Sequence, residues 1–206
     1  MLVNKVLIRY YVLMNARITQ QLLERLSSLL RSESRTLLMN HGLQPVQFEA
    51  LHYLSICNRY SDTPMAVTEF LGQTKGTVSQ TLKVLEKKGL LEKIADADDK
   101  RVTRLQITKK GKNLVENILP SPVLYAASEF ITDETMQATN SCLSSLLYNL
   151  QSANQFKTFG QCHSCQHNIK KSSGEYLCGL TKEALTKKEV KLICRDHAPN
   201  LSIACN

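Results

Sequence analysis

The stretch TKGTVSQTLKVLEKKGLLEK, residues 74–93, decides the fold expected of this chain. Its aliphatic residues recur at helical spacing and predict an amphipathic helix over 74–88, which Gly89 ends. The stripe expected to face the core is formed by Val78, Leu82 and Leu85. A shorter helix is predicted at 64–71, with Gly72 after it. Two short helices joined by a glycine-containing turn are typical of a helix-turn-helix unit.

The next stretch, DADDKRVTRLQITKKG at residues 96–111, predicts a β-hairpin beside that unit. Over 101–107, β-branched and apolar residues are interleaved with polar ones, which is typical of a strand. A first strand is expected at 90–94, and the Asp-rich turn 96–99 joins the two. A hairpin that directly follows a helix-turn-helix predicts the wing of a winged helix.

The predicted helix turns a polar face outward, and this face is suited to DNA. Thr74 is a natural N-cap, and the Gln80 amide can pair bidentately with adenine. Arg101 stands at the hairpin tip, where a planar guanidinium can enter a minor groove. The predicted DNA-contacting residues are Thr74, Lys75, Gly76, Thr77, Ser79, Gln80, Lys83, Lys100, Arg101 and Arg104.

The distribution of charge supports the same partner. The chain of 206 residues has 26 Lys and Arg against 18 Asp and Glu, and so a formal net charge of +8. Eleven basic residues stand against five acidic ones within 73–112, so most of the surplus lies in the predicted helix and hairpin. A concentrated positive surplus favours a polyanionic partner. The alternatives are a solvated basic face and a winged helix that docks on protein, which would not need so dense a basic surface.

With these motifs in register, the chain resembles the MarR family of transcriptional regulators over about residues 15–152. The most specific parts are the Asp-Asp-Lys-Arg hairpin tip and the exit LQITKKG at 105–111. The resemblance implies a winged helix and a homodimer built by the terminal helices. It also implies that the helix from Thr74 enters the major groove while Arg101 reaches the minor groove. Members of the family usually repress transcription and release DNA when a ligand, metal or oxidant acts.

The predicted fold class is mostly α with a small β-hairpin wing, a helical dimerisation region and a small C-terminal metal-binding segment. The expected domains are an N-terminal extension (1–14), a MarR-like DNA-binding and dimerisation domain (15–156) and a cysteine-rich metal-binding tail (157–206). Residues 1–13 either come from a misplaced start codon or add packing to the first helix. Pro120 and Pro122 interrupt the long helix typical of the family, so a kink is expected there.

The tail carries four cysteines in the pattern C-x2-C-x12-C-x15-C. They are Cys162, Cys165, Cys178 and Cys194, within the strings CHSC, YLCGL and LICRDH. A two-residue gap lets two thiolates grip one metal, and the later cysteines complete four ligands. The same set can hold an iron–sulfur cluster, which the dispersed spacing slightly favours over Zn²⁺. The tail also resembles cysteine-rich extensions of some MarR-like regulators, a resemblance that does not fix the metal.

Other interpretations of the cysteines and histidines remain open. A thioredoxin-like pair would need a βαβ setting, which the pattern lacks, and unliganded cysteines would leave a short segment without a staple. His163, His167 and His197 could replace a thiolate and favour zinc, although exposed polar histidines are the commoner case. Cys57 and Cys142 lie among apolar residues and are predicted to be small core residues.

These features predict a cytoplasmic regulator, most simply a repressor, that binds operator DNA as a homodimer. Its affinity would be modulated through the four-cysteine site or a small ligand. No stretch reaches the ~20 apolar residues of a transmembrane helix, so no membrane partner is expected. No nucleophile–base constellation or Gly-rich phosphate loop is present, so no enzyme is expected and a thiol-redox enzyme is disfavoured. A zinc-stapled protein that uses the winged helix for protein contacts is the second alternative.

Overall fold

The computed structural model describes residues 2–97, 99–153 and 157–200, with backbone alone for 2–10. Asp98 of the predicted Asp-rich turn lies outside the described residues. The helices are α1 (Leu2–Met39), α2 (Pro45–Ile56), α3 (Pro64–Leu71), α4 (Lys75–Lys87), α5 (Lys109–Ile118), α6 (Pro122–Ser128) and α7 (Asp133–Ala153). The strands are β1 (Leu91–Ala95), β2 (Thr103–Ile107), β3 (Asn168–Lys170), β4 (Tyr176–Cys178) and β5 (Ala184–Leu185), with short 3-10 turns η1 (Cys162–Ser164) and η2 (Glu189–Lys191).

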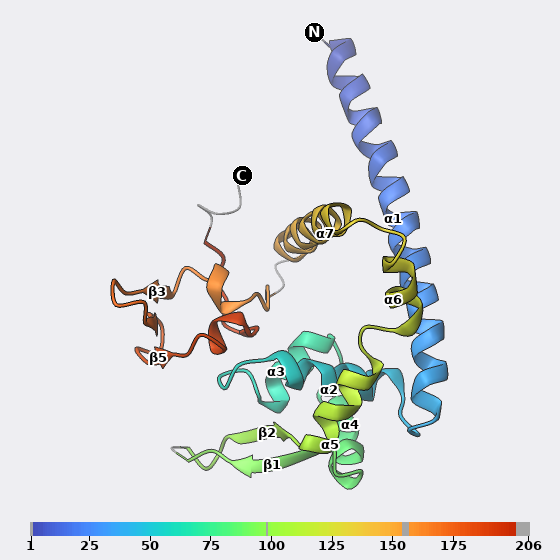
Figure 1. Ribbon diagram of the computed structural model, residues 1–206. Helices are drawn as coiled ribbons and strands as arrows, with labels where there is room; N and C mark the ends of the chain where they lie inside the picture. The colour runs from blue at the N-terminus through green and yellow to red at the C-terminus, as the bar shows by residue number, and fades with distance from the viewer. Residues whose placement is uncertain (1, 98, 154–156, 201–206) are drawn as a thin grey trace.

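The predicted winged helix is confirmed. The α3 and α4 helices are separated at Gly72, whose φ of 59° is the left-handed conformation that glycine adopts readily. Antiparallel strands β1 and β2 follow α4 and pair Leu91 with Ile107 at the base of the hairpin. Figure 1 shows the hairpin extending away from the helices, as a wing does.

A compact apolar core holds α2, α3, α4, α5 and the base of the wing together. The side chains of Tyr53 and Leu51 on α2 are fully buried, and the Tyr53 hydroxyl donates a hydrogen bond of 2.8 Å to the Ser61 carbonyl. α1 reaches this core with its C-terminal end, where Leu38 is fully buried. The aliphatic stripe of α4 was predicted from the sequence. The burial of Tyr53 was not, because tyrosine is as often partly exposed as buried.

The exit from the wing depends on one glycine. Thr108 caps α5 by accepting a hydrogen bond of 3.1 Å from the Gly111 amide, and its own amide donates to the Leu90 carbonyl. A Cβ atom on Gly111 would lie 2.3 Å from that carbonyl oxygen, so a side chain cannot fit there. The Thr-Lys-Lys-Gly exit therefore fixes α5 directly against the end of α4.

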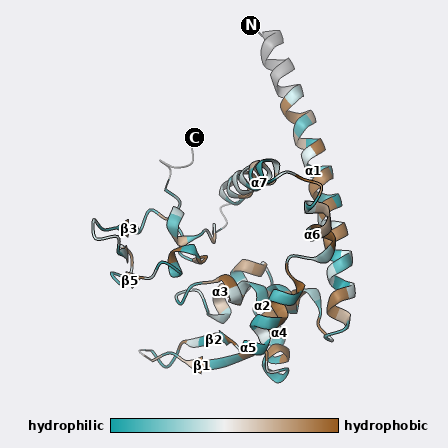
Figure 2. Cartoon of the chain, viewed as in Figure 1, coloured by the Kyte–Doolittle hydropathy of each residue, from teal (hydrophilic) through white to brown (hydrophobic). Residues whose placement is uncertain are grey.

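The helices α1, α6 and α7 form an arm to one side of the winged helix (Figure 1). The helical pattern breaks between Ile118 and Pro122, as the two prolines predicted. The Val123 amide donates a hydrogen bond of 2.8 Å to Glu33, which joins α6 to α1. Apolar residues follow this arm in Figure 2, and many of their side chains are exposed, among them Leu22, Leu26, Leu29, Val123, Tyr125, Phe130, Leu143 and Leu147. The prediction that Cys142 is a core residue is wrong, because its position on α7 is exposed in the single chain.

The tail folds against the winged helix and contributes to its core. Strands β3, β4 and β5 form a small antiparallel sheet in that order. The Phe159 ring, at the start of the tail, packs edge-on against Tyr53 and Phe70, with ring centroids 5.9 Å and 5.3 Å apart. Ile193 packs against the same core. Within the part of the chain that the structure describes, no helix combines the length and apolar character needed to cross a membrane.

Candidate DNA interface and four-cysteine site

The α4 helix presents a continuous polar face to solvent. Its N-terminus is capped by Thr74, whose hydroxyl accepts a hydrogen bond of 3.2 Å from the Thr77 amide. The inward side buries Val78, Thr81, Leu82 and Leu85. The predicted DNA-contacting residues of the helix are all exposed, namely Lys75, Gly76, Thr77, Ser79, Gln80 and Lys83. The residues of α4 that were predicted to contact DNA therefore share one accessible surface.

The two wing arginines have different surroundings, although the sequence grouped them together. The Arg101 side chain is 90% exposed and meets the Asp99 carboxylate with two bonds of 2.9 Å. This pairing lowers the pKa of Asp99. Lys100 beside it is also exposed. The wing tip therefore holds two cationic side chains that point into solvent and are free of the core.

Arg104 of β2 is engaged inside the protein. Its side chain is 31% exposed and pairs with Asp62 at 2.9 Å and with Asp96 at 2.5 Å. The same guanidinium donates a hydrogen bond of 2.8 Å to the Arg59 carbonyl. Contact with DNA would require some of these bonds to open. The structure thus places Arg104 apart from the exposed set and gives it a role in holding the wing.

The four tail cysteines meet at one small cavity of about 30 Å³. Cys162 and Cys165 come from η1 and its C-cap, Cys178 ends β4, and Cys194 follows Ile193. Asn58, Tyr60 and His167 complete the cavity wall, together with Leu180, Thr181, Leu185 and Asp196. Two walls of this cavity therefore come from different parts of the chain, the tail and the loop after α2.

Burial affects the acidity of these thiols. It raises the pKa of Cys162 to about 11, and the neighbouring Cys165, Cys194 and Cys178 add to the rise. Burial also raises the pKa of Cys194, while hydrogen bonding to the Asn58 and Ser61 side chains opposes that rise. Without a metal, the Cys162 and Cys194 thiols are therefore protonated near neutral pH, and metal binding would have to release these protons.

The four cysteine side chains line one cavity but are not arranged around a single ion position in the described residues. Across the described ranges 2–97, 99–153 and 157–200, no group of three or more His, Cys, Asp and Glu side chains is arranged to hold a metal ion. The thiol donor set still suits soft metals, because four sulfurs share one cavity wall. The structure thus brings the four predicted ligands together at one cavity.

The histidines have more specific surroundings than the sequence indicated. His163 is exposed, as expected, whereas the expectation of an exposed side chain is wrong for His167 and His197. The His197 ring lies 2.7 Å from the Thr158 hydroxyl and 3.0 Å from the Ser164 hydroxyl. Burial lowers the pKa of this ring. His197 therefore serves to pack the two ends of the tail together.

Cys57 agrees with its prediction as a small core residue. Its side chain is half-buried and packs against the winged-helix core. Burial raises the pKa of its thiol to about 12, so it is an unreactive thiol.

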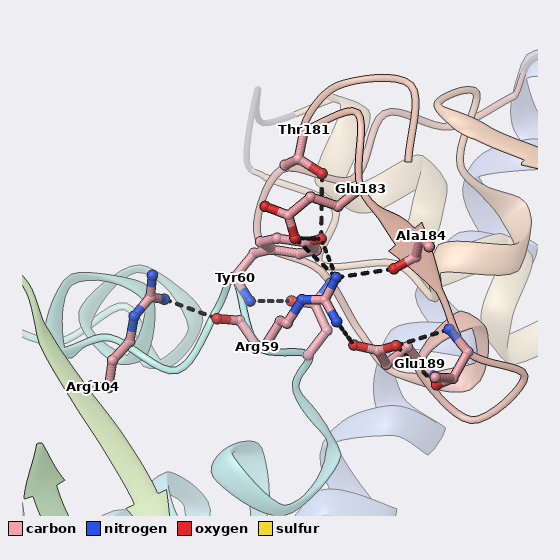
Figure 3. A network of polar contacts seen from close by, with 9 residues as sticks. Arg59, Tyr60, Arg104, Thr181, Glu183, Ala184 and Glu189 are labelled. Atoms are coloured by element: carbon pink, nitrogen blue, oxygen red, sulfur yellow. Dashed lines mark hydrogen bonds and ion pairs between the residues drawn. The ribbon is translucent and has the colours of Figure 1, made fainter. Parts of the chain in front are cut away.

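The contacts that dock the tail were missed by the sequence analysis. Arg59 donates to Glu183 at 2.9 Å and to the Ala184 carbonyl at 3.0 Å, and pairs with Glu189 (Figure 3). Its guanidinium carbon lies 5.0 Å from the centre of the Tyr60 ring. Glu183, Ala184 and Glu189 are each separated from Arg59 by more than 120 positions, so no local pattern could have indicated these contacts.

Comparison with known proteins identifies the same region. Residues 41–102 match the profile described as MarR family. The uncharacterized HTH-type transcriptional regulator YsmB of Bacillus subtilis (strain 168) is 22% identical over 134 residues, which are 63% of this chain and 88% of the relative. The residues that the profile matches include α2, α3, α4 and β1 of the winged helix.

Solved structures agree on the fold. A MarR family protein from Bacillus stearothermophilus superposes with a TM-score of 0.57 at 22% identity, covering 66% of this chain and 96% of that one. The S. aureus protein MepR, in a structure described as its DNA-binding conformation, gives a TM-score of 0.55 at 24% identity, covering 65% and 98%. These likenesses show the winged-helix fold, and the profile match shows similarity to the MarR family over residues 41–102.

Proposed function

We propose that this chain is a DNA-binding transcriptional regulator that represses its target genes. The observation that carries the proposal is the exposed polar face of α4 next to the exposed guanidinium of Arg101. In this arrangement α4 enters the major groove, where Gln80 and Lys83 meet base edges or phosphates. Arg101 reaches the adjacent minor groove, whose negative potential attracts a guanidinium. The similarity to the MarR family supports the same function.

The regulator acts as a homodimer in this proposal. Its arm, formed by α1, α6 and α7, exposes large apolar side chains on all three helices. Many large apolar side chains exposed on neighbouring helices indicate an association site in a soluble protein. Pairing two arms would place two α4 helices on successive half-sites, about 34 Å apart along the DNA. Sedimentation equilibrium should therefore give twice the chain mass, and a monomeric protein would contradict this part of the proposal.

The four-cysteine site holds a metal centre in this proposal, with an iron–sulfur cluster preferred and a zinc ion as the alternative. Two observations support it: the four cysteines line one cavity, and, within residues 157–200, the tail's own apolar cluster has only Cys162, Leu185 and Val190 as buried members. So small a core needs a staple. In a 4Fe–4S cluster each cysteine sulfur binds a different iron, so the four ligands need not converge on one ion. When bound, such a centre would make the site sensitive to oxidants or to metal supply.

Metal analysis after anaerobic purification tests this part directly. A brown protein with iron and sulfide identifies a cluster, and a colourless protein with one zinc per chain identifies zinc. The effector is tested by comparing DNA affinity before and after metal removal. Equal affinities would contradict metal control and favour the alternative effector, a small ligand in the dimer crevice.

The DNA-binding function is tested with charge reversal at the proposed interface. The Lys83→Glu/Arg101→Glu double variant should lose at least about tenfold in affinity for a fragment from its own promoter, because it replaces two phosphate attractions with repulsions. The matched control is Lys170→Glu/Lys187→Glu, which changes the charge equally at two exposed positions of the tail. A double variant that gives the wild-type footprint would refute the proposed function.

A further inference from the structure

The loop between α2 and α3, residues 57–62, stands between the cysteine cavity and the wing. On one side, Asn58 and Tyr60 line the cavity beside the four cysteines. Cys194 of the tail lies in the same cavity wall as these two loop residues. This loop is therefore part of the cysteine site, although it belongs to the winged helix by its place in the chain.

Backbone and side-chain bonds hold the tail to this loop on both sides of Cys194. The Asn58 amide donates to the Ile193 carbonyl at 2.9 Å, and the Ile193 amide donates to Ile56 at 3.0 Å. The Arg195 amide donates to the Ser61 hydroxyl at 2.8 Å. Because the residues before and after Cys194 are both bonded to the loop, Cys194 cannot shift without moving it.

The opposite side of the same loop is bonded to the wing. The Arg104 guanidinium donates to the Arg59 carbonyl at 2.8 Å and pairs with Asp62 at 2.9 Å. The Leu105 amide of β2 donates to the Asp62 carbonyl at 2.7 Å. Figure 3 shows Arg59 with its side chain among the tail acids and its carbonyl on Arg104. A single residue thus touches the tail and the wing at once.

Hydrogen bonds within the loop restrict its conformation. The Ser61 amide donates to the Asn58 carbonyl at 3.0 Å, and the Ser61 hydroxyl donates to the Asn58 side chain at 2.7 Å. Both side chains are buried. A short, buried, internally bonded segment moves as a unit, since a partial shift would break hydrogen bonds that water cannot replace.

We propose that loop 57–62 couples the cysteine site to the wing, so that the state of the four cysteines sets the position and stability of β2. Arg59 and Asp62 are the positioning residues: Arg59 holds the tail, and Asp62 holds the wing. The coupling rests on the proposed function in one respect, the metal bound by the cysteines. It provides the physical connection that allosteric control of DNA binding would require, a contiguous set of contacts between the two sites.

Hydrogen exchange of the wing, measured by mass spectrometry, tests the coupling separately from DNA binding. The full chain is compared as purified anaerobically and after treatment with ferricyanide and EDTA, followed by dithiothreitol. In wild type, exchange in β2 should rise at least about threefold on metal removal, because the Leu105 bond is released. In Arg59→Ala the rise should be largely absent, whereas Lys187→Ala, the same charge change at an exposed tail position, should behave as wild type.

The outcomes separate the coupling from the proposed function. An Arg59→Ala protein that keeps its metal and still shows the wild-type rise overturns the coupling. If Arg59→Ala loses the metal, Asp62→Asn decides in the same way, because Asp62 bonds to the wing and is not in the cavity wall. A wild-type protein whose hydrogen exchange in β2 is the same with and without the metal also overturns the coupling. If hydrogen exchange of the wing depends on the metal and the affinity for DNA does not, the coupling is supported and metal control of DNA binding is refuted. A protein purified anaerobically without any metal refutes both.

Discussion

The winged helix and the tail are stabilised in different ways. The winged helix buries an apolar cluster drawn from α1 to α5 and the wing, in which Leu51 and Leu82 are almost wholly enclosed. The tail buries a much smaller cluster of its own and adds Phe159 and Ile193 to the winged-helix core. It is also held by polar contacts to the loop after α2, above all those of Arg59. The first region can fold by apolar burial, whereas the second depends on docking and, in our proposal, on a metal.

This difference has a consequence for regulation. A region that contributes little core of its own can change its state without unfolding the rest of the molecule. In our proposal, such a change reaches the wing through the loop that holds both the tail and β2. The winged helix therefore carries the proposed DNA-binding surface, and the tail carries the proposed sensor.

The largest effect is expected from a cavity in the winged-helix core. Leu51→Ala should lower the free energy of unfolding by about 2–5 kcal/mol, because Leu51 is fully buried and its neighbours are fixed. Leu185→Ala, in the tail cluster, should leave the main unfolding transition much less affected. Urea denaturation followed by circular dichroism measures both. Equal losses would show that the two regions share one cooperative core and would break the comparison.

The next effect concerns the tail alone. Cys178→Ser should remove one proposed ligand and raise the rate of tryptic cleavage in the tail by about tenfold or more, since a segment without its staple opens locally. The winged helix should keep its unfolding midpoint. Cys142→Ser is the matched control, because that cysteine is exposed on α7 and is not in the wall of the cysteine cavity. Unchanged metal content and cleavage in Cys178→Ser would show that the tail does not depend on this thiol.

A smaller effect distinguishes the two wing arginines. Arg101→Ala should weaken binding to all DNA sequences and reduce the slope of log affinity against log salt by about one, because one phosphate-directed cation is lost. Arg104→Ala should instead destabilise the wing, since its guanidinium bonds to Asp62, Asp96 and the Arg59 carbonyl. A fluorescence-anisotropy salt series and thermal unfolding separate the two. An unchanged salt slope in Arg101→Ala would refute its placement on DNA.

These contrasts explain how much the sequence could predict. The stripe of Val78, Leu82 and Leu85 and the capping Thr74 are local signals, so α4 and the wing were predicted within a residue or two at most boundaries. The convergence of four cysteines followed from residue type and spacing. The part of the cavity wall that comes from the loop after α2 could not be predicted, because Asn58 lies more than a hundred positions from Cys162. The different environments of Arg101 and Arg104 likewise depend on acids brought together only by folding.

The smallest effect is expected at a second contact between the tail and the winged helix, the ion pairs of Glu69. Glu69 on α3 pairs with Arg195 through two bonds of 2.6 Å and with Lys157 at 3.1 Å, and hydrogen bonding from Arg195 lowers the pKa of Glu69 below its usual 4.5. Glu69→Gln should reduce stability by under about 1 kcal/mol, because the pair is partly solvated. A depressed carboxyl pKa stabilises the fold above the unfolded value and loses that contribution as pH falls through the folded value.

The difference between wild type and Glu69→Gln should therefore be constant above about pH 5 and disappear in more acidic solution. Thermal unfolding at several pH values measures it, with Glu116→Gln, an exposed carboxyl on α5, as the control. A difference that persists at acid pH would mean that Glu69 contributes by packing and not by charge. The tail would then be held by shape at this contact, and Arg59 would be left as its principal electrostatic anchor on the winged helix.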